Sequence, residues 1–334
     1  MKYILQRRQV IKFALSDASS SHFHPFMQVA LRFSSLAYSP SGALLVGGSE
    51  YGALYIWDAF SGEVLFGPLP SHTCDMGDLV THLCFVTDDI VLSSCFDGSI
   101  HQWNIRAGEP IGEAFTAHSR SVLKVASLPD KKMAASITVD GELILWRLDT
   151  LEVVRQSRVM VDVAVFAFSS DGTKMATLYH HMLHTYDVEN CRLISEVDLK
   201  PYIPPMSLVL AFSLNASKVF FGSGSDSLAV WDVDKEEIKE EILILDYRNP
   251  VEIICSPDGA LVASLSNGRQ NKIHIWSTAT RELVDVLDDG GPFPAFAFTP
   301  DSKNLTYVLR DTELSVNPLK NIKKVCFLVV SICH

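Results

Sequence analysis

Two stretches of the sequence contain the residue types of a nucleophilic triad. In the better defined one, His118, Ser136 and Asp140 could move a proton from a serine hydroxyl to an imidazole that a carboxylate orients. Ser136, however, lies in the run Met133 to Ile137, which predicts a β-strand packed beside Trp146. No substrate carbonyl can reach a serine in that position. We therefore expect a structural role for these residues and no enzyme activity.

A second group of candidate residues, His180, His181 and His184, has the side-chain type of a zinc site. His180 and His181 fall in a predicted turn and His184 in the strand that follows, where alternation sends neighbouring side chains to opposite faces. Zinc would also need a third or fourth ligand converging from elsewhere. Gly222-Ser223-Gly224 lacks the lysine and the following helix of a phosphate loop. The sequence predicts no metal and no cofactor.

The stretch from His118 to Asp149 predicts four short strands that would position the serine and histidine. The tight turns include Pro129-Asp130-Lys131-Lys132 after the first strand and the hairpin signal Asp140-Gly141 after the second. The third strand ends at Trp146. Four strands in a meander form the blade of a β-propeller, and because one such sheet cannot bury both faces, it must be repeated.

Two periodic series show that the unit is repeated. Positions equivalent to Trp146 recur at intervals that match the roughly 40–45 residues of a propeller blade. They are Trp57, Trp103, Trp146, Tyr186, Trp231, Trp276 and, in seventh place, Asn317. Turn-forming segments, from Ser39-Pro40-Ser41-Gly42 to Thr299-Pro300-Asp301-Ser302, follow each first strand in the same phase. Two series in phase predict seven equivalent sheets.

With these motifs the chain resembles the WD-repeat family. The motifs that carry the resemblance are Ile56-Trp57-Asp58, Gln102-Trp103-Asn104, Val230-Trp231-Asp232 and Ile275-Trp276-Ser277. The repeat and the resemblance together imply an all-β fold, a seven-bladed β-propeller of four-stranded antiparallel blades over residues 34–330. Residues 1–33 would be an N-terminal extension that could supply one outer strand, and residues 331–334 a tail.

In this family the last blade commonly takes one strand from the other end of the chain. Two segments could fill that place, Ile4 to Leu15 or Lys324 to Val330, and spacing favours the second. The segments from Gly62 to His72 and from Gly108 to His118 are also similar to linkers in the WD-repeat arrays of fungal NACHT-type receptors.

The resemblance further implies a buried chain of hydrogen bonds that links a histidine, a serine, an aspartate and the tryptophan of one blade. Equivalent spacing assigns these roles in the second and third blades. The residues are His72, Ser93, Asp97 and Trp103, and His118, Ser136, Asp140 and Trp146.

The amino-acid composition limits the classes of partner and the compartments that we expect. The net charge of −11 disfavours nucleic acid and anionic membrane surfaces as unaided partners. Seven scattered cysteines do not suggest a disulfide framework, so we expect a reducing compartment, the cytoplasm or, as the alternative, the nucleus. No stretch approaches the roughly 20 apolar residues of a membrane span.

These features predict a non-enzymatic binding function, in which a monomeric propeller acts as an interaction scaffold or a ligand-sensing module. Protein partners would bind the face near the channel mouth, formed by hairpins between second and third strands and by the segments before first strands. The residues expected there are Glu50, Tyr51, Asp75, Phe96, Arg120, Val139, His181, Arg248, Arg269, Gln270, Phe293 and Arg310. The alternative is a substrate receptor of a cullin-type ubiquitin ligase, because Trp103-Asn104-Ile105-Arg106 resembles a motif of such receptors.

Overall fold

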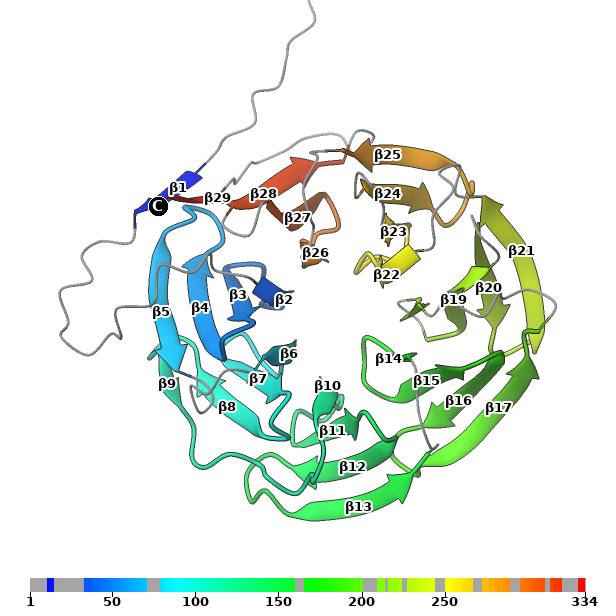
Figure 1. Ribbon diagram of the computed structural model, residues 1–334, viewed down its shortest axis with the longest axis horizontal. Helices are drawn as coiled ribbons and strands as arrows, with labels where there is room; N and C mark the ends of the chain where they lie inside the picture. The colour runs from blue at the N-terminus through cyan, green and yellow to red at the C-terminus, as the bar shows by residue number, and fades with distance from the viewer. Residues whose placement is uncertain are drawn as a thin grey trace, which may run out of the picture.

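The computed structural model describes residues 11–14, 33–70, 79–159, 165–200, 209–213, 216–223, 227–243, 250–266, 272–288, 295–309, 313–319 and 330–333. All regular elements in these ranges are strands. The sheets stand around a central axis, and in each sheet the strands step from the axis to the rim (Figure 1). In the described ranges no helix has the length and hydropathy to cross a membrane.

Six sheets each contain four consecutive strands in antiparallel order, and we call them blades one to six. Blade one contains β2 (Phe33–Tyr38), β3 (Leu44–Ser49), β4 (Ala53–Asp58) and β5 (Val64–Pro70). Blade two contains β6 (Val80–Phe85), β7 (Ile90–Cys95), β8 (Ile100–Asn104) and β9 (Glu109–Pro110). Blade three contains β10 (Val122–Ser127), β11 (Met133–Thr138), β12 (Glu142–Arg147) and β13 (Val153–Arg158). Blade four contains β14 (Val165–Phe168), β15 (Lys174–Tyr179), β16 (Met182–Asp187) and β17 (Arg192–Asp198). Blade five contains β18 (Leu210–Phe212), β19 (Lys218–Ser223), β20 (Ser227–Asp232) and β21 (Glu237–Leu243). Blade six contains β22 (Pro250–Cys255), β23 (Leu261–Ser266), β24 (Lys272–Ser277) and β25 (Leu283–Leu287).

The remaining sheet closes the ring with five strands in the order β1-β29-β28-β27-β26. It contains β26 (Phe296–Phe298), β27 (Asn304–Leu309), β28 (Glu313–Pro318), β29 (Val330–Cys333) and β1 (Ile11–Ala14). β29 pairs antiparallel with β28, whereas β1 pairs parallel with β29. The prediction of seven four-stranded antiparallel blades is therefore wrong, because only six of the described sheets have that form.

The closing sheet differs because it joins the two chain ends. Strands from opposite ends have no tight hairpin between them, so their relative direction is not fixed as it is inside a blade. The fourth place is taken by β29, which begins at Val330, where the expected segment ends, and includes residues 331–333 of the expected tail. β1 comes from within the alternative segment, Ile4 to Leu15, and adds a fifth strand.

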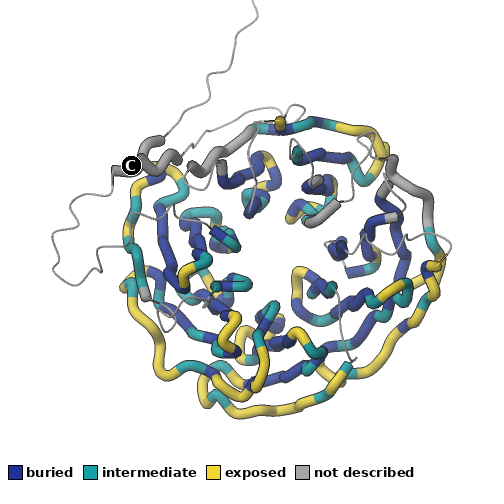
Figure 2. The backbone as a smooth tube through the Cα atoms, in the orientation of Figure 1, coloured by how far each residue is buried: buried dark blue, intermediate teal, exposed yellow. Residues whose placement is uncertain are grey.

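The core lies between neighbouring sheets. One cluster joins Leu92 and Ile100 of blade two to Ile144 and Trp146 of blade three, and each of these side chains is fully buried. Full burial of such side chains stabilises the fold by roughly 1.5–3 kcal/mol each. Burial is deepest in the middle strands, whereas the outer strand β13 is exposed along most of its length (Figure 2). Blades therefore depend on their neighbours for most of their stability.

The same turn joins the first strand to the second in blade six and in the closing sheet. The hydroxyl of Ser256 donates to Asp258 over 2.6 Å, and Thr299 donates to Asp301 over the same distance. Each carboxylate also accepts a backbone N–H two residues later. This is the geometry that the in-phase turn series predicted.

Candidate functional site

The segment that leads into β10 is held against blade three by a buried imidazole. His118 Nδ1 lies 2.9 Å from Glu142 Oε2, and His118 Nε2 lies 2.6 Å from Ser136 Oγ. Burial lowers the pKa of His118, against the opposing effect of the Glu142 carboxylate. The neutral ring therefore donates from Nδ1 to Glu142 and accepts the Ser136 hydroxyl at Nε2.

The carboxylate in this relay is not the one that the family resemblance assigned. Asp140 instead accepts the Thr138 hydroxyl over 2.7 Å and Arg158 Nη2 over 2.6 Å. The Thr138 hydrogen bond is the largest cause that lowers the pKa of Asp140. Asp140 sits in the hairpin turn, whereas Glu142 opens β12. Because side chains alternate along a strand, Glu142 lies on the same face as Trp146, and this sequence signal could have identified it.

Blade two shows a different part of the predicted chain of hydrogen bonds. The indole nitrogen of Trp103 donates to Ser93 Oγ over 3.1 Å, and both residues are buried. Asp97 accepts the backbone N–H and the hydroxyl of Ser99 over 2.7 and 2.6 Å. His72 lies outside the described residues. The serine–tryptophan bond therefore occurs in blade two and the histidine–serine bond in blade three.

In blade three the tryptophan is held by stacking. No hydrogen-bond partner is found for Trp146 Nε1 in the described part of the chain. Its ring stacks on Phe115 with centroids 4.3 Å apart and planes 10° apart. A buried N–H without a partner costs about 1–3 kcal/mol, and the stacking and the burial of the large ring offset part of that penalty.

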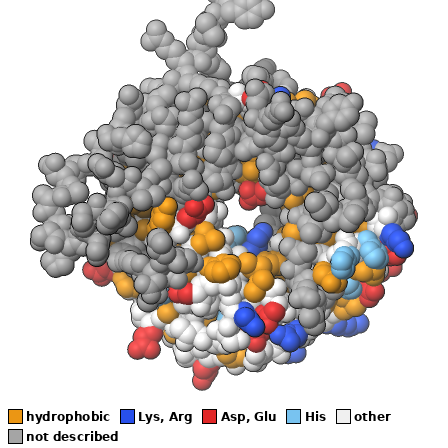
Figure 3. Space-filling view, viewed as in Figure 1, with side chains coloured by type: hydrophobic (Ala, Val, Ile, Leu, Met, Phe, Trp, Pro, Cys, Tyr) orange, Lys and Arg blue, Asp and Glu red, His pale blue; other side chains and the backbone are white. Residues whose placement is uncertain are grey.

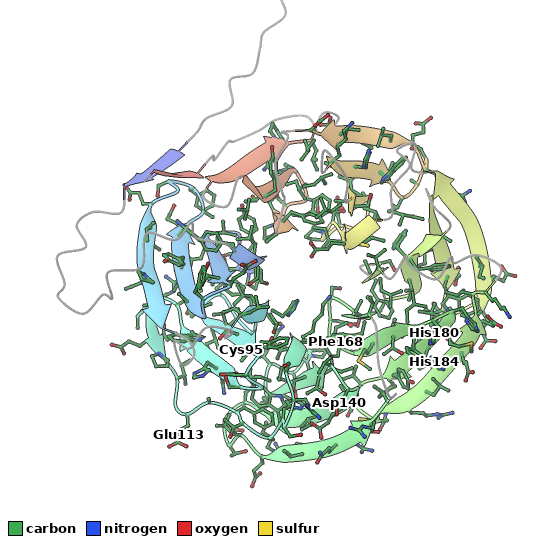
Figure 4. All side chains as sticks on the ribbon, viewed as in Figure 1. Cys95, Glu113, Asp140, Phe168, His180 and His184 are labelled. Carbon is green, nitrogen blue, oxygen red and sulfur yellow. The ribbon has the colours of Figure 1, made fainter. Side chains whose placement is uncertain are left out.

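Glu142, His118 and Ser136 thus have the hydrogen bonds of a nucleophilic triad. Ser136 is nevertheless 0% exposed, in the middle of β11, where it pairs with a residue of β10 on one side and of β12 on the other. No carbonyl carbon can reach its hydroxyl, so the relay ties a loop to a sheet and does not supply a nucleophile. The labelled Asp140 marks the hairpin next to this relay in Figure 4.

The hairpins between second and third strands carry exposed apolar side chains in three successive blades. Phe96 is 51% exposed, Val139 42% and Tyr51 37%. The backbone N–H of Phe96 donates to Leu79 over 3.0 Å, and that of Val139 donates to Ser121 over 3.1 Å. Each of these two hairpins is therefore fixed to the segment before the first strand of its own blade.

The hairpin of blade two is also packed against blade three. A Cβ atom added at Gly98 would lie 3.0 Å from the carbonyl oxygen of Arg120, and the φ of Gly98 is +94°. Only glycine fits this close approach without strain. Phe96 and the exposed Arg120 are therefore on adjoining loops. We call the surface formed by Tyr51, Phe96, Arg120 and Val139 the docking face.

The other predicted face residues are only partly placed. His181 lies in the hairpin of blade four, and its Nε2 is 3.7 Å from Asp198 Oδ1. Glu50 lies half-buried in the hairpin of blade one. The rest fall outside the described residues: Asp75, Arg248, Arg269, Gln270, Phe293 and Arg310.

The histidines considered as metal ligands lie on blade four (Figure 4). His180 occupies the turn with a φ of 53°, and His184 lies on β16 with its Nε2 3.7 Å from Glu196 Oε2. Over the described ranges, no three His, Cys, Asp or Glu side chains are grouped so that they could hold a metal ion.

A model of the family described as "WD domain, G-beta repeat" matches residues 29–58 and 65–104, which contain most of blades one and two. The chain carries WD repeats. The resemblance drawn from the Trp-Asp type motifs is thereby confirmed, whereas the similarity of the linkers to NACHT-type receptor arrays stays a prediction.

Among curated proteins, the chain is 25% identical to the 66 kDa stress protein of Physarum polycephalum over 61% of its length and 33% of that protein. It is 30% identical to telomerase protein component 1 of Mus musculus over 73% of its length and 9% of that protein. It is 28% identical to human WD repeat and SOCS box-containing protein 1 over 32% of its length and 24% of that protein. The chain thus spans a third or less of these relatives.

Proposed function

We propose that this chain is a non-enzymatic scaffold or sensing module that binds a protein or peptide partner on the docking face. The observation that carries the proposal is the half-exposed ring of Phe96 beside Arg120. Aromatic and arginine side chains are the residue types most enriched among the residues that dominate binding energy at interfaces.

The rigidity of the loops supports the same reading. Backbone hydrogen bonds fix the Phe96 and Val139 hairpins, and the contact at Gly98 links two blades. A surface that is already ordered loses little conformational entropy when a partner binds. A large exposed aromatic ring on such a loop has no role in the core, so binding is the function that best explains it.

The proposal is tested by capturing partners with the purified chain and comparing two phenylalanine variants. Phe96 lies on the docking face, whereas the more exposed Phe60, at 71%, lies in the β4–β5 turn at the opposite end of its sheet. Phe96→Asp combined with Arg120→Glu should weaken the binding of a captured partner at least about tenfold. Phe60→Asp should leave it unchanged. The reverse result would reject the docking face.

A second candidate is a substrate receptor of a cullin-type ubiquitin ligase. The similarity to WD repeat and SOCS box-containing protein 1 favours it, together with the exposed Arg106 of the Trp103-Asn104-Ile105-Arg106 segment. Arg106 pairs with Asp89 at the end of blade two opposite the docking face. A partner could therefore bind one end of the blade and an adaptor the other.

This candidate requires binding to a cullin adaptor protein. A pull-down with purified adaptor should retain the chain, and Arg106→Glu should abolish retention while Phe96→Asp should not. Failure of the wild-type chain to bind any cullin adaptor would remove this candidate and leave the scaffold proposal in place.

A further inference from the structure

The outer strand of blade three has a free edge, whereas three other outer strands are blocked or short. β5 contains Pro68 and Pro70, and β9 has only two residues, the second of which is Pro110. Proline has no N–H to donate and a short strand offers few backbone groups, so neither edge favours a further strand. β29 is covered by β1. β13, in contrast, contains no proline and is exposed at five of its six positions.

The backbone of β13 presents hydrogen-bonding groups to the rim of the ring. β13 pairs only with β12, and a bulge lies near its start. Beyond the bulge, the backbone N–H of Val159 donates to the carbonyl of Gly141 over 3.0 Å. Because hydrogen-bonded and non-hydrogen-bonded residues alternate in an antiparallel pair, the N–H and C=O groups of Gln156 and Arg158 point away from β12. Both residues are exposed.

The closing sheet shows that the rim of this molecule accepts a fifth strand. β1 lies outside β29 and pairs with it at four positions. The regular part of β13, from Arg155 to Arg158, also pairs with β12 at four positions. β13 therefore offers an edge of the length that β29 gives to β1. In strand addition of this kind, main-chain hydrogen bonds supply affinity and side chains supply specificity.

The charges on and beside β13 indicate which segment fits. β13 contains Arg155 and Arg158 and no acidic residue. Arg155 Nη1 donates over 3.3 Å to the carbonyl of Asn190, in the turn that leads to the exposed Arg192 of blade four. Among the described residues, neither Arg155 nor Arg192 has an acidic partner within 4.0 Å, whereas Arg158 pairs with Asp140. Lys and Arg side chains gather at the lower right of the space-filling view, over the rim of blades three and four (Figure 3).

The neighbouring outer strand does not share this charge. β17 also contains no proline, but Glu196 and Asp198 follow Arg192 along it. That edge would repel an acidic segment. Two copies of the chain that paired β13 with β13 would bring arginines against arginines, which is unfavourable between adjacent strands. The charges therefore favour an acidic segment of another protein at β13 over pairing between two copies of β13.

We propose that the free edge of β13 binds an extended acidic segment of a partner protein as a fifth strand of blade three. Acidic side chains three positions apart pair with Arg155 and Arg158, and the outward backbone groups of Gln156 and Arg158 bond to the backbone of the segment. Val153 and Val154, which are 44% and 46% exposed, contact apolar side chains beside the acidic ones. This site lies on the rim and does not depend on the docking face.

The experiment measures the fluorescence anisotropy of the labelled peptide Val-Glu-Thr-Thr-Glu-Val in the presence of the full chain. The order of its residues is the same in both directions, so it can pair parallel or antiparallel, and its glutamates have the spacing of Arg155 and Arg158. The wild-type chain should bind it at least about tenfold more tightly than Val-Lys-Thr-Thr-Lys-Val. Arg155→Glu should weaken binding of the acidic peptide at least about fivefold and strengthen binding of the lysine peptide.

A matched pair of variants tests the backbone contribution. Gln156→Pro removes the N–H that points away from β12 and should abolish binding of the acidic peptide, whereas Gln156→Ala keeps that N–H and should bind within about twofold of wild type. Both variants lose the hydrogen bond from Gln156 Nε2 to Glu142 Oε1, so this loss cannot explain a difference between them. Arg120→Glu, on the docking face, should not alter the affinity for either peptide.

Circular dichroism melts establish that each variant is folded, and sedimentation velocity gives its oligomeric state. The proposal is overturned if the folded wild-type chain binds neither peptide at millimolar concentration, if it binds both equally, or if Gln156→Pro binds the acidic peptide as tightly as Gln156→Ala. A dimer of the wild-type chain that Gln156→Pro dissociates would also overturn it, because the edge would then belong to a second copy.

Discussion

Blades three and four share one backbone plan but are stabilised by different polar contacts. In blade three, His118, Ser136 and Glu142 form a buried relay inside one blade. Blade four has Ala176 at the position of Ser136 and Tyr186 at the position of Trp146. The Tyr186 hydroxyl donates over 3.0 Å to the carbonyl of Val159, which follows the last strand of blade three.

The comparison shows that the repeat specifies strands and turns, whereas polar networks are added blade by blade. A relay within a blade fixes a loop on one face, and the same loop carries Arg120. The hydrogen bond between Tyr186 and Val159 fixes the distance between two sheets, whereas it does not hold a loop of blade four in place, so that loop depends on packing. Blades two and three, which carry Phe96, Arg120 and Val139 of the docking face, are therefore the place where rigid loops are expected.

The largest expected effect comes from removing the imidazole of the relay. His118→Ala breaks two hydrogen bonds and leaves the buried Ser136 hydroxyl without its partner, so it should destabilise the chain by about 3 kcal/mol. His184→Ala is the matched change in blade four, where the ring is 3.7 Å from Glu196 and stacks on Tyr186. It should cost about 1 kcal/mol or less. Urea denaturation measures both, and equal losses would contradict the difference between the blades.

Acidification should lower the free energy of unfolding through His82, which lies on β6 of blade two. Its pKa is lowered to about 3 in the folded chain, so below its ordinary value of 6.5 the unfolded chain binds a proton that the folded chain does not. Stability is therefore unaffected above that value and falls as pH decreases, by about 2 kcal/mol near pH 5. His82→Gln should remove this part of the pH dependence. If His82→Gln leaves the dependence of stability on pH unchanged, the imidazole of His82 must be protonated in the folded chain.

Two carboxylates of blade three, Glu142 and Asp140, should differ in how much stability their removal costs in urea denaturation. Glu142→Gln weakens a hydrogen bond to a buried imidazole and should cost about 1–1.5 kcal/mol. Asp140→Asn keeps an oxygen for the Thr138 hydroxyl and loses mainly its pairing with Arg158, which is 58% exposed. It should cost about 0.5 kcal/mol. A larger loss for Asp140→Asn would restore Asp140 as the main support of the blade.

Much of the architecture could be predicted from the sequence because its signals are local and repeated. Trp146 near the end of β12 and the Ser256–Asp258 turn follow from short patterns that recur in phase. The closing sheet could not be predicted, because two apolar segments from opposite chain ends competed for one place and both are used. The register shifts in the first strand pairs of blades three and six were also hidden, because a bulge moves the pairing by one residue without a local sequence signal.

The smallest effect tests the bond between blades. Tyr186→Phe removes only the hydroxyl that donates to Val159 and should cost about 0.5–1 kcal/mol, because the ring and its packing remain. Its effect should be local. Amide hydrogen exchange should quicken in β13 and β16, on the two sides of the lost bond, and stay unchanged around Ser136. If exchange quickened around Ser136 as well, blade three would depend on its neighbour for its internal order, and the relay could not be regarded as a separate stabilising unit.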